Sequence, residues 1–125
     1  MEYIDGIEWL RVMLKLDLND WLLIGCVLSA LTALPLAMRL VPPNPLYGFR
    51  TRFTRSDPAV WYAANAFAGR AMFVASLVSA AIVLYSPLRT AGGWTAIAIV
   101  MVPIALATLA GFVCLRHLRE TAQRR

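Results

Sequence analysis

The segment PNPLYGFRTRFT, residues 43–54, decides how the rest of the chain is interpreted. It lies between two hydrophobic stretches and is therefore a connection, yet it combines prolines, an asparagine, a glycine and aromatic residues with arginines. A plain linker between two membrane helices needs none of these side chains. Trp61, Asn65 and Gly69 follow at spacings of four, which places them on one face of a helix. Gly69 has no side chain and leaves a notch on this face. The pattern predicts a structured loop that is held against this helix and received by the notch.

The composition indicates a membrane protein. Of 125 residues, 60% are hydrophobic and 15% are charged, and a soluble domain of this size could not bury so much apolar surface. The net charge is +5, but the arginines flank apolar stretches and form no aromatic-interleaved soluble face, so we expect no nucleic-acid partner. Cys26 and Cys114 fall within apolar stretches, where we expect reduced thiols. The length allows a single domain, residues 1–125.

Three stretches are long and apolar enough to cross a bilayer, namely about residues 21–38, 67–85 and 94–115. A transmembrane helix needs roughly 20 residues to cross about 30 Å of hydrocarbon. The second helix should begin well before its apolar part, because Asp57 can cap a helix and Pro58 suits the first helical position. We predict an all-α membrane protein with three transmembrane helices and a motif loop over residues 39–66.

Residues 1–20 form a separate predicted element. Charged side chains such as Glu8 and Arg11 recur every three or four positions, and apolar ones such as Ile7 and Leu14 lie largely on the other face. This pattern predicts an N-terminal amphipathic helix that lies on the outer leaflet of the membrane. In the alternative interpretation, the apolar face packs against a partner protein.

The distribution of basic residues predicts the orientation. The motif loop and the tail after residue 115 each hold four arginines, whereas the opposite side has only Arg11, Lys15 and Arg89. Positively charged flanks stay in the cytoplasm. We therefore expect the N-terminus outside the cell, with the motif loop and the C-terminus in the cytoplasm.

Within the motif loop, Pro45 restricts the backbone and Gly48 can adopt a positive φ angle. Arg50 lies between Phe49 and Phe53, where its guanidinium could bind a carboxylate, a phosphate or backbone carbonyls in a bidentate manner. Two interpretations stay open: Arg50 and its neighbours only pin the loop to the helices, or they face a ligand or partner. Other arginines should lie near anionic lipid headgroups or extend toward them. These are Arg39, Arg52, Arg55 and Arg70.

The arrangement Asn…Gly-x-Arg-Thr…Thr, followed by a tryptophan and a glycine, resembles the SdpI/YfhL family of small bacterial membrane proteins. The resemblance is close over residues 43–73 and implies a multi-pass protein of the bacterial inner membrane. The family is named for an immunity protein that protects its producer from a secreted peptide toxin and helps to signal the toxin's presence. Arg52 stands where many relatives have proline, and Asn65 stands where some have histidine. Residues that match the pattern are Asn44, Gly48, Arg50, Thr51, Thr54, Trp61 and Gly69.

The sequence offers little for catalysis. The single histidine, His117, lies in the basic tail, and we find no nucleophile–base pair, no metal-ligand cluster and no cofactor motif. The resemblance implies a non-enzymatic protein that gives resistance to, or senses, a membrane-active peptide or envelope stress. The alternative is a small accessory subunit of a larger membrane complex, and a homo-oligomer is also open. Candidate ligand- or partner-binding residues are Asn44, Tyr47, Gly48, Arg50, Thr51, Thr54, Trp61, Asn65 and Gly69.

Overall fold

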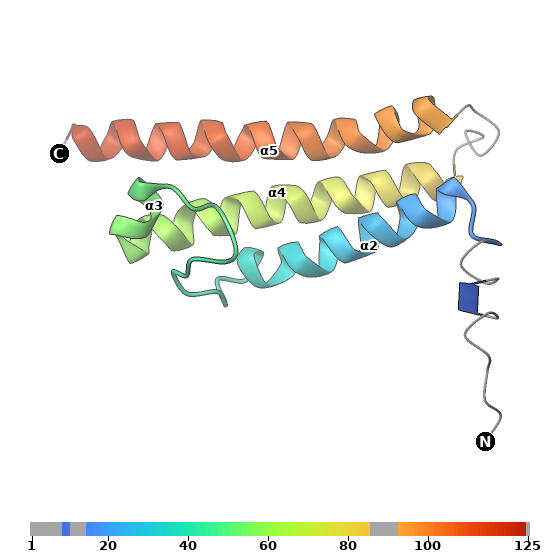
Figure 1. Cartoon of the computed structure of the whole chain (residues 1–125). Helices are drawn as coiled ribbons and strands as arrows, with labels where there is room; N and C mark the ends of the chain where they lie inside the picture. The colour runs from blue at the N-terminus through green and yellow to red at the C-terminus, as the bar shows by residue number, and fades with distance from the viewer. Residues whose placement is uncertain (1–8, 11–14, 86–92, 125) are drawn as a thin grey trace, which may run out of the picture.

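The computed structural model describes residues 9–10, 15–85 and 93–124. Its helices are α2 (Leu18–Ala37), α3 (Arg52–Ser56), α4 (Pro58–Tyr85) and α5 (Gly93–Gln123). In Figure 1, the three long helices lie side by side, with α4 between α2 and α5. All three are long and apolar enough to cross a membrane, so the expected three-span, all-α fold is confirmed. The amphipathic helix expected over residues 1–20 falls mostly outside the described residues.

Helix α2 begins at Leu18, three residues before the apolar stretch that starts at Trp21. Asp17 and Asp20 form a capping box that fixes this start. The Asp20 backbone N–H donates to Oδ1 of Asp17 at 2.9 Å, and the Asp17 N–H donates to Oδ2 of Asp20 at 3.1 Å. Two otherwise unpaired donors are satisfied in this way, and the acidic side chains suit the positive end of the helix.

Helix α2 ends in a Schellman motif. The Leu40 N–H donates to the Pro35 carbonyl at 2.9 Å, and the Arg39 N–H donates to the Leu36 carbonyl at 3.1 Å. This geometry needs a left-handed residue after the helix, a position that usually holds glycine. Here it holds Arg39, with φ = 60°. The chain therefore turns sharply out of α2 into the connection that precedes α3.

Helix α4 begins as the sequence predicts. Asp57 precedes Pro58, and its carboxylate accepts a hydrogen bond from the Ala59 N–H at 2.8 Å. With 28 and 31 residues, α4 and α5 span about 42 and 46 Å at 1.5 Å per residue. Both exceed the roughly 30 Å of hydrocarbon. The excess length is the first turns of α4 and the last turns of α5, because the apolar stretches occupy the rest of both helices. These turns lie at the same end of the bundle as α3 (Figure 1).

Small and hydroxylated residues hold the helices together. The hydroxyl groups of Ser76 in α4 and Ser29 in α2 form a hydrogen bond, with their Oγ atoms 3.0 Å apart. The Ser79 hydroxyl donates to the Val100 carbonyl of α5 at 3.1 Å. Gly25 does not take part, since a Cβ atom there would meet nothing within 4 Å. Large apolar side chains on the outer faces of α2 and α5 are exposed, as contact with lipid requires. Examples are Leu28, Leu31, Leu106 and Leu109.

Candidate functional site

The candidate site is centred on residues 44–51, which we call the motif turn. It is the part of the irregular connection between α2 and α3 that directly precedes α3, which begins at Arg52. The Phe49 N–H donates to Oδ1 of Asn65 at 2.6 Å, and the Asn65 amide nitrogen lies 3.5 Å from the Phe49 carbonyl. The amide thus faces both backbone groups of Phe49, much as a neighbouring strand would. Non-helical backbone near a membrane needs such internal partners.

Asn65 is itself fixed by α4. Its amide nitrogen donates to the Trp61 carbonyl at 3.0 Å, one helical turn earlier, and only 2% of the residue is exposed. Trp61 is fully buried, and its indole N–H donates to the Val41 carbonyl at 2.9 Å. The first turns of α4 therefore hold the chain at two points, residue 41 before the motif turn and residue 49 within it.

Both the backbone conformation at residue 48 and the limited space beside Asn65 require a glycine. Its φ angle is +103°, which L side chains rarely adopt. A Cβ atom on Gly48 would lie 2.5 Å from Oδ1 of Asn65, the atom that accepts the Phe49 hydrogen bond. The glycine of the motif thus allows the backbone to approach the amide of α4.

The two threonines of the motif cap α3. The Thr54 N–H donates to Oγ1 of Thr51 at 3.1 Å, and the Thr51 N–H donates to Oγ1 of Thr54 at 2.8 Å. The Thr54 hydroxyl is buried and also donates to the Phe49 carbonyl at 2.9 Å. These contacts link α3 to the motif turn, and they account for both threonines without a ligand.

Asn44 and Arg50 form hydrogen bonds to the backbone of residues 45–47 in the first half of the motif turn. Oδ1 of Asn44 accepts from the N–H groups of Leu46 and Tyr47 at 2.9 and 2.7 Å. One terminal nitrogen, Nη1, of Arg50 donates to the Pro45 carbonyl. The Arg50 side chain is exposed, and no other hydrogen bond is formed by it within the described part of the chain. The rest of its donor fork is free to meet a ligand.

Gly69 has a different role from the one expected. We predicted that the notch at Gly69 receives the loop, and this was wrong. A Cβ atom on Gly69 would lie 2.5 Å from the Ala37 backbone nitrogen and 2.9 Å from the Ala33 carbonyl oxygen, both in α2. The notch therefore receives the last turn of α2. On this face of α4, Trp61 and Asn65 bind the connection between α2 and α3, whereas Gly69 packs against α2 itself.

A contact between the motif turn and α5 was not predicted from the sequence. The Phe49 ring meets Phe112 edge to face, with ring centroids 5.0 Å apart and planes at 75°. A Cβ atom on Gly111 would lie 3.0 Å from the Phe49 ring, so the glycine makes room for it. In the sequence, Ala107 and Gly111 are small residues spaced by four, a pattern that favours close helix packing but does not indicate an aromatic partner.

A cavity of about 150 Å³ lies below the motif turn. Tyr47, Gly48 and Asn65 line it from one side, and Ala107 and Thr108 line it from α5. The Tyr47 hydroxyl oxygen is buried and has no hydrogen-bond partner among the described residues. Burial also raises the pKa of Tyr47, so the hydroxyl stays protonated and can donate.

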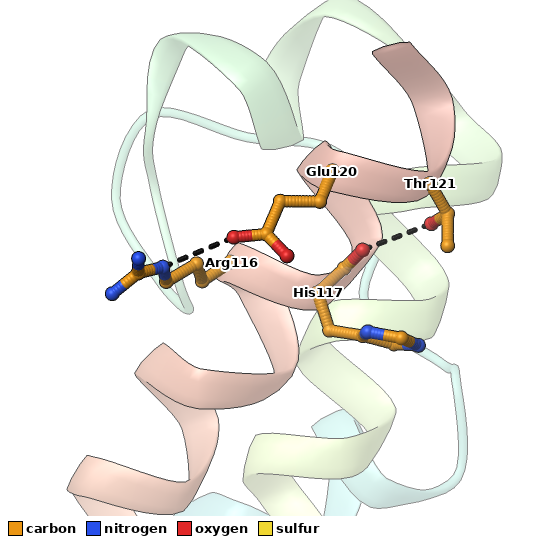
Figure 2. A network of polar contacts seen from close by, with 4 residues as sticks. All are labelled: Arg116, His117, Glu120 and Thr121. Atoms are coloured by element: carbon orange, nitrogen blue, oxygen red, sulfur yellow. Dashed lines mark hydrogen bonds and ion pairs between the residues drawn. The ribbon is translucent and has the colours of Figure 1, made fainter. Parts of the chain in front are cut away.

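The four arginines expected at lipid headgroups are all exposed, which suits that role without testing it. Within the described ranges, the structure has one ion pair, between Nε of Arg116 and Oε1 of Glu120 at 3.1 Å (Figure 2). The same ranges contain no group of three or more potential metal ligands. The exposed arginines are Arg39, Arg52, Arg55 and Arg70.

Three membrane-length helices and a tightly hydrogen-bonded turn define a small multi-pass helical membrane protein. The SdpI/YfhL protein family matches residues 40–113, which is more than half of the chain, and the chain belongs to this family. The match begins before the motif turn and continues through α4 into the last third of α5. A search of curated proteins and a search of solved structures found no match.

Proposed function

We propose that the protein acts by binding, as an SdpI-type protein that confers resistance to, or senses, a membrane-active peptide or envelope stress. The binding surface is the motif turn, which the Asn…Gly-x-Arg-Thr pattern holds in shape and on which Arg50 is exposed. The arginine distribution favours an inner-membrane protein with this turn and the C-terminus in the cytoplasm. In this topology, a membrane-active peptide meets the turn after it has inserted into or crossed the bilayer.

The observation that carries the proposal is the exposed Arg50 on a rigid support. The polar side chains of Asn44, Thr51 and Thr54 form hydrogen bonds within the turn or between it and α3. Arg50 donates to the Pro45 carbonyl through one nitrogen, and its other donors are exposed. Leu46, beside it, is 85% exposed. An exposed apolar side chain next to a partly free guanidinium suits a peptide that offers an apolar side chain and carbonyl or carboxylate oxygens. A preorganised turn also loses little entropy on binding.

The test compares two arginine variants in cells challenged with a panel of secreted membrane-active peptides. Arg50→Gln should lose protection, whereas Arg55→Gln, which removes the same charge from an exposed position of α3, should retain it. Arg50→Lys should also lose protection. An ammonium lacks the planar guanidinium, in which one nitrogen can bind the Pro45 carbonyl while the others offer parallel donors to a ligand. Full protection by Arg50→Gln at the parental protein level would refute this role of Arg50.

The accessory-subunit alternative makes a different prediction. Purification in mild detergent would then recover a larger membrane protein in fixed stoichiometry, with or without peptide. The proposal expects the protein to be recovered without such a partner in unchallenged cells. A stoichiometric partner retained in Arg50→Gln would favour the accessory role.

A further inference from the structure

A groove of about 420 Å³ separates α3 from the C-terminal part of α5. It lies beside the motif turn and shares Thr51 with it, and Phe112 in its lining also contacts Phe49. Both helices contribute basic and apolar side chains to its lining. The basic residues are Arg52, Arg116 and Arg119, and the apolar residues are Phe53, Phe112 and Leu115.

The groove carries an excess of positive charge. Its three arginines come from two helices, and all are exposed. Glu120 is the one acidic residue paired with them in the described part of the chain, and it contacts only Nε of Arg116 (Figure 2). Both partners are at least half exposed, so this surface ion pair is weak and leaves both terminal nitrogens of Arg116 available. Three guanidinium groups around one groove favour an anion with several oxygen acceptors.

The apolar lining of the groove continues along the membrane-facing surface of α5. Phe112 is 56% exposed, and the exposed Leu109 lies three residues earlier, about one helical turn toward the apolar part of α5. The apolar stretch of α5 ends at Leu115, and the basic tail begins at Arg116. The groove therefore lies where hydrocarbon gives way to headgroups. A ligand that fits it has an anionic head at the arginines and a hydrocarbon chain along Phe112.

We propose that this groove is a binding site for an anionic glycerophospholipid, with its phosphate held by Arg52, Arg116 and Arg119 and the start of an acyl chain against Phe112. The site does not depend on the function proposed above. It does adjoin the motif turn, because the Phe112 ring contacts Phe49 and Arg52 directly follows Thr51. It differs from a general attraction of basic residues to the membrane, since it includes Arg52 and leaves out Arg55.

The experiment uses the full chain in dodecyl maltoside micelles with increasing fractions of phosphatidylglycerol, and counts retained lipid by native mass spectrometry. Phosphatidylcholine with the same acyl chains is the control lipid. The parent should retain phosphatidylglycerol in preference. Arg52→Gln, Arg116→Gln and Arg119→Gln should each weaken its binding about five-fold, the effect of one basic contact. Arg55→Gln is the matched control on α3 and should bind as the parent does.

Two results would overturn the proposal. If Arg55→Gln weakens binding as much as Arg52→Gln, the attraction is spread over the surface and there is no site in the groove. If glycerol 1-phosphate at the same concentration displaces the lipid completely, the groove selects a soluble phosphate and not a lipid. Because the substituted side chains are exposed, gel filtration should show the parental elution volume for every variant.

Discussion

Gly48 and Asn65 approach so closely that a Cβ atom on Gly48 would lie 2.5 Å from the side-chain oxygen of Asn65. That oxygen accepts the hydrogen bond of the Phe49 N–H at 2.6 Å. A substitution at Gly48 therefore acts on three features together: its positive φ angle, the space beside α4 and the hydrogen bond that holds the motif turn. The relationship explains why residue 48 of the motif is a glycine.

Gly48→Ala should destabilise the protein by about 1–3 kcal/mol, through backbone strain and overpacking. The measurement is the thermal unfolding midpoint in detergent, with limited proteolysis at residues 44–51 as a second readout. Gly25→Ala is the matched control, because Gly25 lies inside α2 with open space around it. It should stabilise the helix by roughly 0.5–1 kcal/mol. Equal midpoints for Gly48→Ala and the parent would contradict the packing described here.

The helical fold could be predicted because long apolar stretches and the Asp57–Pro58 start are local signals. The docking of the loop on Trp61 and Asn65 could also be predicted, since a spacing of four places both on one face of α4. The spacing could not show which neighbour covers each part of that face, and so Gly69 was assigned to the wrong partner. Its true partner, the last turn of α2, depends on how the helices cross.

Contacts between distant segments were beyond prediction. Phe49 and Gly111 are 62 positions apart, and nothing in either local sequence indicates that one ring fills the space beside the other. The groove between α3 and α5 also depends on residues that are far apart in the sequence. Arg116 appears in the sequence as part of a basic tail, and only the packing of α3 brings Arg52 to the same groove.

The hydroxyl contact between Ser29 and Ser76 predicts a disulfide crosslink. Their Oγ atoms are 3.0 Å apart, so cysteines at both positions should join α2 to α4 under mild oxidation, in a background without Cys26 and Cys114. Thiol alkylation followed by mass spectrometry measures the crosslink. The control pair is Ser29→Cys with Ser79→Cys, because the Ser79 hydroxyl faces α5. More crosslink in the control pair than in the test pair would mean that α4 is rotated from its described position.

Arg39 occupies a left-handed position that favours glycine. Arg39→Gly should therefore stabilise the protein by about 1 kcal/mol, because it removes the steric cost of a Cβ atom at φ = 60°. The thermal midpoint should rise in neutral detergent. A lower midpoint would show that the Arg39 side chain makes a contact worth more than the strain it imposes.

The proposed orientation can be tested with cysteines introduced one at a time into a chain without Cys26 and Cys114. A membrane-impermeant thiol reagent added to whole cells should label positions 2 and 92, which lie outside in this topology. It should not label positions 55 and 124 until the cells are opened. Labelling at position 55 in intact cells would show that the orientation is the reverse of the proposed one.

The central claim is that the motif turn is a preformed binding surface centred on Arg50. Photocrosslinking from position 46 in cells challenged with a membrane-active peptide tests it most directly, since Leu46 is exposed beside Arg50. Position 84, exposed near the far end of α4, is the control. We predict a peptide adduct from position 46 that is absent from position 84 and is lost in Arg50→Gln but kept in Arg55→Gln. An adduct from position 46 that persists undiminished in Arg50→Gln would contradict the claim, as would equal adducts from both positions.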